Sequence, residues 1–251
     1  MMLFVLLMGL VIGSFLNVCV YRIAKEESIV YPSSHCMTCG YELKWKDLIP
    51  VVSYIFIKGK CRSCREKISL RYPAVEITNG IIYLLLFLQF GLTIKFIGYC
   101  ILTSILIVIG MIDYDTKFVY RSTTIFGIIT GVIFILMNWF VNRNGVIDSL
   151  IGGTIGFAVI GLIVILTKGM GEGDIEIATV CGLFLGIKGI GISLFLSFII
   201  GGIVATIIII FKIKDRKSEM AFGPFLAIGG IITMLWGTKL LDMYMKNFFL
   251  T

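Results

Sequence analysis

Charged residues are scarce in this chain: Asp, Glu, Lys and Arg make up 15% of its 251 residues, whereas 58% of the residues are hydrophobic. Soluble globular domains carry about 25% charged residues and roughly 45–50% apolar ones. The composition therefore excludes an ordinary water-soluble enzyme, and it also excludes an intrinsically disordered protein. Because a membrane-spanning helix needs about 20 predominantly apolar residues, we predict an all-α polytopic membrane protein.

The apolar run at the N-terminus lacks the features of a cleaved signal peptide. No Lys or Arg precedes it, no A-x-A-like cleavage site ends it, and Arg22 is its first charged residue. A signal peptide starts with a basic region and ends at small residues. We therefore expect residues 1–22 to form a retained first transmembrane helix. Internal repeats and low-complexity tracts are not evident elsewhere in the chain.

Further apolar runs predict seven more transmembrane helices, which gives eight in total. They lie near residues 74–94, 96–112, 122–141, 147–167, 175–187, 189–211 and 221–241. Only the stretch between Arg22 and Pro73 is polar and large enough to form a separate domain. We expect a small loop domain over residues 23–73 and a seven-helix membrane domain over residues 74–251.

The net charge of +7 could indicate nucleic-acid binding, but in so apolar a chain basic residues more often mark cytoplasmic loops. With eight spans, one set of loops holds 17 of the 22 lysines and arginines. The other set, which includes both termini, holds the remaining five. The basic set is expected in the cytoplasm, so we predict a plasma-membrane protein with outward termini and no nucleic-acid partner.

Four of the seven cysteines form two C-x2-C pairs in the polar loop, with 21 residues between the pairs: Cys36, Cys39, Cys61 and Cys64. This spacing favours tetrahedral zinc bound by four thiolates. Two disulfides or free thiols are the alternative, although a cytoplasmic loop is a reducing environment. A loop of about 50 residues also needs a staple to fold. With all four ligands from the protein, the zinc is expected to be structural.

The histidine and the other three cysteines of the chain have no predicted role. His35, the only histidine, adjoins Cys36 and is expected to be a bystander. Cys19, Cys100 and Cys181 stand alone in apolar helices, where a buried thiol behaves as a small hydrophobic side chain.

Acidic residues mark the ends of two apolar segments. Asp113 and Asp115 end the predicted third helix, and Asp174 begins the sixth after a glycine-rich turn that contains Gly171 and Gly173. Because two helices intervene, both ends return to the same membrane face. Two neighbouring carboxylates share one proton, which is the arrangement of an aspartic protease. The two glycines would let a substrate backbone approach closely.

A simpler interpretation treats these acids as helix caps or as partners of nearby cations. Lys117, Arg121 and Lys168 are close enough in sequence to pair with them. Glu172 and Glu176 fit that interpretation well, as solvated or paired surface charges. A transporter that uses Asp113 and Asp174 as a proton or cation relay is a further alternative, as is a zinc-stapled membrane scaffold without chemistry.

Several sequence blocks resemble the type IV prepilin peptidases, a family of membrane aspartic proteases. The carboxylate block is Gly171-Glu-Gly-Asp174, which resembles the Gly-x-Gly-Asp signature of that family. The other blocks are Gly13-Ser-Phe-Leu-Asn17-Val-Cys-Val-Tyr-Arg22, Asp47-Leu-Ile-Pro50-Val, Gly59-Lys-Cys-Arg62-Ser-Cys64, Ile68-Ser-Leu-Arg71-Tyr-Pro73 with Glu76, and Phe222-Gly-Pro224 through Gly230. These ordered blocks extend over nearly the whole chain.

The resemblance implies that Asp113 and Asp174 are catalytic, that Gly171 and Gly173 support the second aspartate, and that Asp115 is not catalytic. It implies cleavage of the leader peptide of type IV prepilins or pseudopilins on the cytoplasmic side of the lipid bilayer. It further implies N-methylation of the new N-terminus with S-adenosylmethionine, an activity usually linked to the zinc loop. Residues 74–251 would then be the peptidase domain.

This chain departs from the family pattern near both aspartates. Members often have a histidine directly after the acid that matches Asp115, whereas this chain has Thr116 followed by Lys117. Members often have Pro-Asp where this chain has Tyr120-Arg121, and they frequently have a lysine where this chain has Glu176. These changes leave the leader preference open. No Gly-x-Gly-x-x-Gly follows a predicted strand, so the sequence identifies no S-adenosylmethionine-binding residues.

Overall fold

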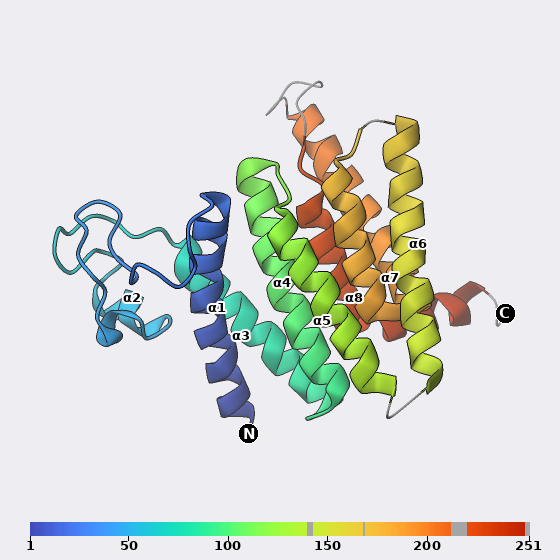
Figure 1. The fold of residues 1–251 in the computed structure, drawn as a ribbon, viewed down its shortest axis with the longest axis horizontal. Coiled ribbons are helices and arrows are strands. Elements are labelled where there is room, and N and C mark those ends of the chain that lie inside the picture. The colour runs from blue at the N-terminus through green and yellow to red at the C-terminus, as the bar shows by residue number, and fades with distance from the viewer. Residues whose placement is uncertain (140–142, 168, 212–219, 249–251) are drawn as a thin grey trace. The chain divides into compact units, whose positions relative to one another are not determined.

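The computed structural model describes residues 1–139, 143–167, 169–211 and 220–248, and over these ranges its regular structure is helical apart from two isolated β-bridges. Figure 1 shows the long helices. The chain forms two compact units, residues Met1–Gly91 and Leu92–Thr251. The predicted all-α membrane class is confirmed, since seven of these helices are long and apolar enough to cross a bilayer.

The first unit is built on a pair of packed helices, α1 (Met2–Ala24) and α3 (Arg71–Phe90). Glycines let the two backbones approach closely: a Cβ on Gly9 would lie 2.8 Å from the Cα of Gly80, and one on Gly13 would lie 2.7 Å from the Cα of Glu76. Asn79 Nδ2 also donates to the Gly9 carbonyl at 2.7 Å. Small residues of this kind allow helices to pack where lipid offers no hydrophobic drive.

The segment between α1 and α3 contains only two short helices, η1 (Trp45–Asp47) and α2 (Val52–Phe56). Arg22, at the end of α1, holds the first part of this segment by donating to the carbonyls of Ser28 and Pro32. Residues 35–42 and 60–67 each form a tight loop closed by one β-bridge. The segment is therefore ordered by loops and side-chain hydrogen bonds, with little regular structure.

The second unit is a bundle of α4 (Ile94–Thr116), α5 (Arg121–Trp139), α6 (Arg143–Thr167), α7 (Glu172–Ile210) and α8 (Gly223–Phe248). These bounds agree with the predicted apolar runs to within about four residues, except that α8 ends seven residues beyond the predicted limit at 241. Helix α4 begins at Thr93, whose hydroxyl accepts from the amide of Phe96, and it ends at Lys117 in the left-handed conformation. Such caps satisfy backbone groups that the helix leaves unpaired.

Helix α7 reverses direction at Gly186 and therefore supplies two spans. Its 39 residues would extend about 58 Å if straight, whereas the bilayer core is about 30 Å thick. Gly186 has φ 70° and ψ −174°, a conformation essentially restricted to glycine. Asp148 Oδ1 accepts from the amide of Ile187 at 3.2 Å, directly after the break.

Contacts on either side of Gly186 establish the direction of each half of α7. The first half of α7 runs antiparallel to α6, because Gly152 lies against Gly182 and Gly156 lies against Ala178. The second half returns antiparallel to α8, because Gly201 lies against Phe225, as Figure 1 also shows. Helix α7 therefore consists of two antiparallel segments, which correspond to the two helices predicted near residues 175–187 and 189–211. The break lies two residues before the predicted Lys188–Gly189 linker.

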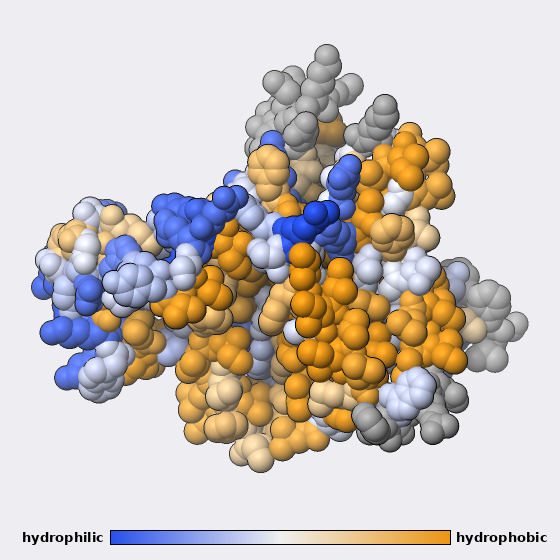
Figure 2. All heavy atoms as spheres, in the orientation of Figure 1, coloured by the Kyte–Doolittle hydropathy of each residue, from blue (hydrophilic) through white to orange (hydrophobic). Residues whose placement is uncertain are grey.

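The outer surfaces of the bundle helices are apolar. Phe126, Ile133, Phe157, Leu162 and Ile165 are all more than half exposed, and Figure 2 shows hydrophobic side chains over much of the bundle. Lipid tails are as apolar as these side chains, so the surface is that of a multi-pass membrane protein. Of the basic residues used in the orientation argument, Lys168, Lys212, Lys214, Arg216 and Lys217 lie outside the described residues.

Candidate functional site

Asp113 and Asp174 lie together in the second unit, although 61 residues separate them in the sequence. Asp113 is in the last turn of α4 and Asp174 is in the first turn of α7. The two residues are only 4% and 5% exposed, and an electrostatic interaction couples their carboxyl groups. The predicted proximity of the two aspartates is confirmed, and so is their position at helix ends.

Each carboxyl group accepts a backbone hydrogen bond. Gly171 donates its N–H to Asp174 Oδ2 at 3.1 Å, and Gly223 donates its N–H to Asp113 Oδ2 at 2.8 Å. Gly223 is the first residue of α8, so its amide has no acceptor within its own helix. The positive ends of α7 and α8 both face this carboxyl pair, which favours one negative charge there.

Gly223 also provides the space that the pair requires. A Cβ at this position would lie 2.5 Å from Asp113 Oδ2 and 3.2 Å from the Cδ1 of Ile177. The Gly223-Pro224 block had no predicted role beyond the family resemblance. The sequence feature that could have drawn attention to Gly223 is the proline that follows it at the start of a predicted helix, where proline is favoured.

The glycines before Asp174 differ in their surroundings. Gly171 is exposed and has few neighbours, which agrees with the expected open approach. A Cβ on Gly173 would instead lie 2.4 Å from the Cβ of Val119. Gly173 therefore allows the start of α7 to pack against the connection between α4 and α5, which sequence analysis did not anticipate.

The other acids near the pair have different surroundings. Glu176 accepts a hydrogen bond from the hydroxyl of Thr124 and lies 3.9 Å from Arg121 Nε, as the simpler interpretation of this residue predicted. Asp115 is exposed, unlike the two buried aspartates. Burial and mutual coupling therefore distinguish Asp113 and Asp174 from their acidic neighbours.

In the first unit, the four loop cysteines converge as the spacing predicts. Their sulfur atoms all lie within 4.8 Å of one another. The Sγ–Sγ distance is 3.8 Å between Cys36 and Cys64 and 4.0 Å between Cys39 and Cys61. Tetrahedral zinc with Zn–S bonds of about 2.3 Å places its sulfurs about 3.8 Å apart. All four cysteines are free, so the geometry fits zinc and not two disulfides.

The two C-x2-C loops share one backbone pattern, offset by 25 residues. The amide of Cys36 donates to the Tyr41 carbonyl at 2.9 Å, and the amide of Cys61 donates to the Glu66 carbonyl at 2.8 Å. The residue after each second cysteine, Gly40 or Arg65, has positive φ. The loops are therefore a structural repeat that was not evident in the sequence, and we call them the two knuckles (residues 35–42 and 60–67).

The electrostatics of the first knuckle suit a metal ligand. The backbone N–H groups of Cys39 and Thr38 donate to the Cys36 sulfur and lower the pKa of that thiol to about 6. Since the thiolate is the form that binds metal, Cys36 is already in its ligating form at neutral pH.

Asp47 connects the two knuckles. Its carboxylate accepts from Arg62 Nε at 2.8 Å, from the Lys44 amide at 3.2 Å and from the Tyr41 hydroxyl at 3.3 Å. Burial alone would raise the pKa of Asp47, but the hydrogen bond from Arg62 and the one from the Lys44 amide outweigh it, so the pKa lies below its ordinary value. Asp47 is therefore a carboxylate at neutral pH and holds Tyr41 and Arg62, one from each knuckle.

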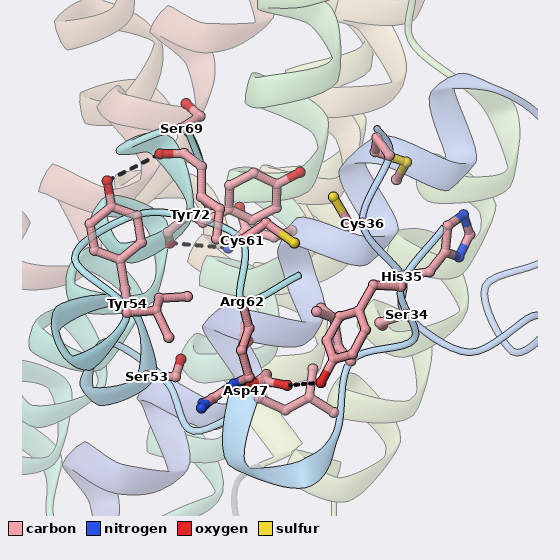
Figure 3. A pocket seen from close by; sticks show the side chains of 18 of the residues that line it. Ser34, His35, Cys36, Asp47, Ser53, Tyr54, Cys61, Arg62, Ser69 and Tyr72 are labelled. Atoms are coloured by element: carbon pink, nitrogen blue, oxygen red, sulfur yellow. Dashed lines mark hydrogen bonds and ion pairs between the residues drawn. The ribbon is translucent and has the colours of Figure 1, made fainter. Parts of the chain in front are cut away.

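A cavity of about 280 Å³ lies among α1, α3 and the two knuckles. Its lining includes Cys36, Cys61, Asp47, Arg62 and Tyr72, and Figure 3 shows Cys61 beside Tyr72. The Tyr54 hydroxyl donates to the Ile68 carbonyl at 3.1 Å, which fixes its ring at the cavity wall. The cavity combines aromatic rings with buried polar groups, which is typical of small-molecule sites.

Two family models match the chain. The Bacterial Peptidase A24 N-terminal domain matches residues 7–90, and the Type IV leader peptidase family matches residues 100–206. The boundary between the two matches lies at the division between the two compact units. The first match contains the cysteine cluster and the cavity, and the second contains both buried aspartates.

Curated relatives cover nearly the full length of the chain. A prepilin leader peptidase/N-methyltransferase of Neisseria gonorrhoeae is 32% identical over 255 aligned positions, which cover 90% of this chain and 87% of that protein. A protein of the same name from Bacillus subtilis is 29% identical and covers 95% of each chain. One from Pseudomonas aeruginosa is 29% identical over 96% of this chain and 92% of that protein. No solved structure matches this chain.

Proposed function

The chain belongs to the type IV leader peptidase family, and we propose that it is a membrane aspartic endopeptidase that removes the leader peptide from type IV prepilins and pseudopilins. Asp113 and Asp174 are the proposed catalytic pair. The observation that carries this proposal is the pairing of two buried carboxyl groups at helix ends that each receive a backbone N–H.

The hydrogen bonds support a different role for each aspartate. Asp113 receives the shorter bond, from the start of α8, and is the carboxylate that takes a proton from the attacking water as the water oxygen bonds to the scissile carbonyl carbon. Asp174 is the protonated partner and gives its proton to the carbonyl oxygen. Collapse of this intermediate breaks the C–N bond: the leaving amine takes up the proton held by Asp113, and a hydroxyl group of the intermediate returns a proton to Asp174 as the new carboxyl group forms.

Cleavage at the cytoplasmic face is part of the proposal. Basic residues are retained on the cytoplasmic side during insertion, and the polar segment between α1 and α3 carries eight of them. Zinc in the four-cysteine cluster would hold the two knuckles together in this segment. With all four ligands supplied by thiolates, it would have no open position for catalysis.

N-methylation of the new N-terminus is the second proposed activity. The relatives that match along the chain carry N-methyltransferase in their names. S-adenosylmethionine would supply the methyl group to the amine that cleavage exposes. The domain predicted from composition over residues 23–73 is proposed as the centre of this activity, together with the packed helices α1 and α3.

The transporter alternative is less consistent with the helix positions. A relay across the membrane requires ionisable groups along its path, whereas Asp113 lies three residues from the end of α4 and Asp174 is the third residue of α7. Both acids therefore lie at helix ends.

The test is conversion of a prepilin in membranes, scored as a change in size. Asp113→Asn and Asp174→Asn each abolish processing while the protein is still expressed and inserted, because neither variant can hold both the ionised and the protonated carboxyl. Asp115→Asn, two residues from Asp113 but exposed, is the matched control and retains processing. Full processing by either of the first two variants would remove that residue from the catalytic pair.

A further inference from the structure

The cavity of the first unit is not used by the proposed cleavage reaction. Its lining residues lie between Ser14 and Glu76, whereas the aspartate pair belongs to the second unit. Its volume of about 280 Å³ is just below the roughly 300–1,000 Å³ that is typical of cofactor and small-molecule sites. The cavity therefore has the size for a small ligand of its own.

Glu76 is the buried acid of this cavity. The residue is 7% exposed, lies on α3 and lines the cavity. Its Oε2 accepts the amide of Val51 at 2.7 Å, and the hydroxyl of Ser14 hydrogen-bonds to the same carboxyl group. These two described partners are uncharged.

Two cations that line the same cavity bond elsewhere: Arg22 donates to the carbonyls of Ser28 and Pro32, and Arg62 donates to Asp47. A buried carboxylate without a directly bonded cation is costly, so the site favours a ligand that brings a positive charge.

Aromatic rings provide the second element of recognition. Tyr21 and Tyr72 line the same cavity as Glu76, and Tyr72 is only about one turn before Glu76 on α3. Aromatic faces attract cations and stack on planar rings. The hydroxyl groups of Ser53 and Ser69 also line the cavity (Figure 3). A ligand with one cationic end and one aromatic end matches this combination.

We propose that this cavity binds a methyl donor of the S-adenosylmethionine class, with Glu76 facing its positively charged sulfonium and amino-acid end and the tyrosines lining the space for its adenosine. The inference rests on the proposed N-methylation and names the site of its cofactor. The knuckles form part of the wall, which gives the four-cysteine cluster a role in donor binding: it shapes the cavity without contacting the reacting atoms.

The experiment measures equilibrium binding of methyl-labelled S-adenosylmethionine to the full-length protein in lipid nanodiscs. Glu76→Gln removes the charge and keeps the shape of the side chain. Ser53→Leu leaves every charge in place and fills part of the cavity. Glu27→Gln is the matched control, because Glu27 is exposed, lies outside both knuckles and does not line the cavity. Zinc content, measured by elemental analysis, reports whether the knuckles remain folded in each variant.

Glu76→Gln and Ser53→Leu weaken binding about tenfold or more, and Glu27→Gln binds as the parent does. Zinc content is equal to that of the parent in all variants. Parental affinity in Glu76→Gln with zinc retained overturns the proposal. If Glu76→Gln loses zinc, Ser53→Leu decides: parental affinity in that variant overturns the cavity assignment.

A separate measurement distinguishes this inference from the proposed function. Wild-type protein is assayed for leader cleavage and for methyl incorporation into the cleaved prepilin. If the wild type incorporates methyl groups and both cavity variants bind the donor as the wild type does, the methyltransferase function stands and the assignment of the donor to this cavity is wrong. Absence of both donor binding and methyl incorporation in the wild type overturns the methylation proposal along with the cavity, whereas leader cleavage is scored independently.

Discussion

Gly223 donates its backbone N–H to Asp113 Oδ2 at 2.8 Å, across 110 residues of sequence. The contact joins the start of α8 to the end of α4 and leaves no room for a side chain at position 223. It makes the first amide of α8 a direct partner of the proposed base. The aspartate pair is therefore held by three helices, of which α4 and α7 carry the acids and α8 supplies the amide.

Gly223→Ala is expected to lower kcat for prepilin cleavage by about tenfold to a hundredfold. The new Cβ would lie 2.5 Å from Asp113 Oδ2 and would separate the carboxylate from the amide. Loss of a hydrogen bond to a charged group costs about 1.5–3 kcal/mol. The measurement is the initial rate of cleavage in membranes. Gly191→Ala, where an added Cβ meets nothing within 4 Å, is the control; equal rates in both variants would contradict the role given to Gly223.

Zinc binding is expected to depend on each knuckle. Cys36→Ser removes one ligand from the first knuckle, and Cys61→Ser removes one from the second. Both substitutions lower the zinc content of the purified protein, because three thiolates do not complete a structural zinc site. Elemental analysis provides the measurement. Cys100→Ser, in a membrane helix of the other unit, keeps the parental metal content. Unchanged zinc in the first two variants would eliminate the proposed metal centre.

The Cys36 thiol is expected to react with iodoacetamide in metal-free protein with a midpoint near pH 6, because its pKa is lowered to about 6 by the backbone N–H groups of Cys39 and Thr38. A lowered thiol pKa means that the thiolate, the reactive form, is present above this pH and is lost as the pH falls below it. An ordinary cysteine titrates near pH 8.5. Mass spectrometry of alkylated peptides gives the midpoint, and a value of about 8.5 would disprove the predicted shift.

Gly186→Ala is expected to lower the thermal stability of the protein in detergent. A non-glycine residue at φ 70° and ψ −174° costs on the order of 1–3 kcal/mol, and the new Cβ would collide with the Asp148 carboxylate. Gly202→Ala in the second half of α7 is the matched control, because nothing lies within 4 Å of its added Cβ. If the two variants melt at the same temperature, the reversal of α7 does not depend on glycine at position 186.

Local patterns were enough to predict the helices and the metal cluster. Hydropathy acts on each contiguous segment, so the apolar runs found most of the span limits and the break in the 175–211 region to within two residues. The C-x2-C pairs predicted the convergence of Cys36, Cys39, Cys61 and Cys64 because tetrahedral zinc ligation imposes its own geometry on four thiolates. Helix parity likewise predicted that Asp113 and Asp174 return to one face.

The remaining features depend on contacts between distant residues, which no local pattern encodes. The sequence by itself determined a membrane protein with eight crossings, a four-cysteine cluster and two acids at one end of the bundle. Only the tertiary structure decided that Gly223 holds Asp113, that Gly173 packs on Val119 and that Glu76 faces a cavity. The physical reason is that burial and hydrogen bonding at these sites arise from the packing of whole helices, whereas hydropathy and ligand spacing are properties of single segments.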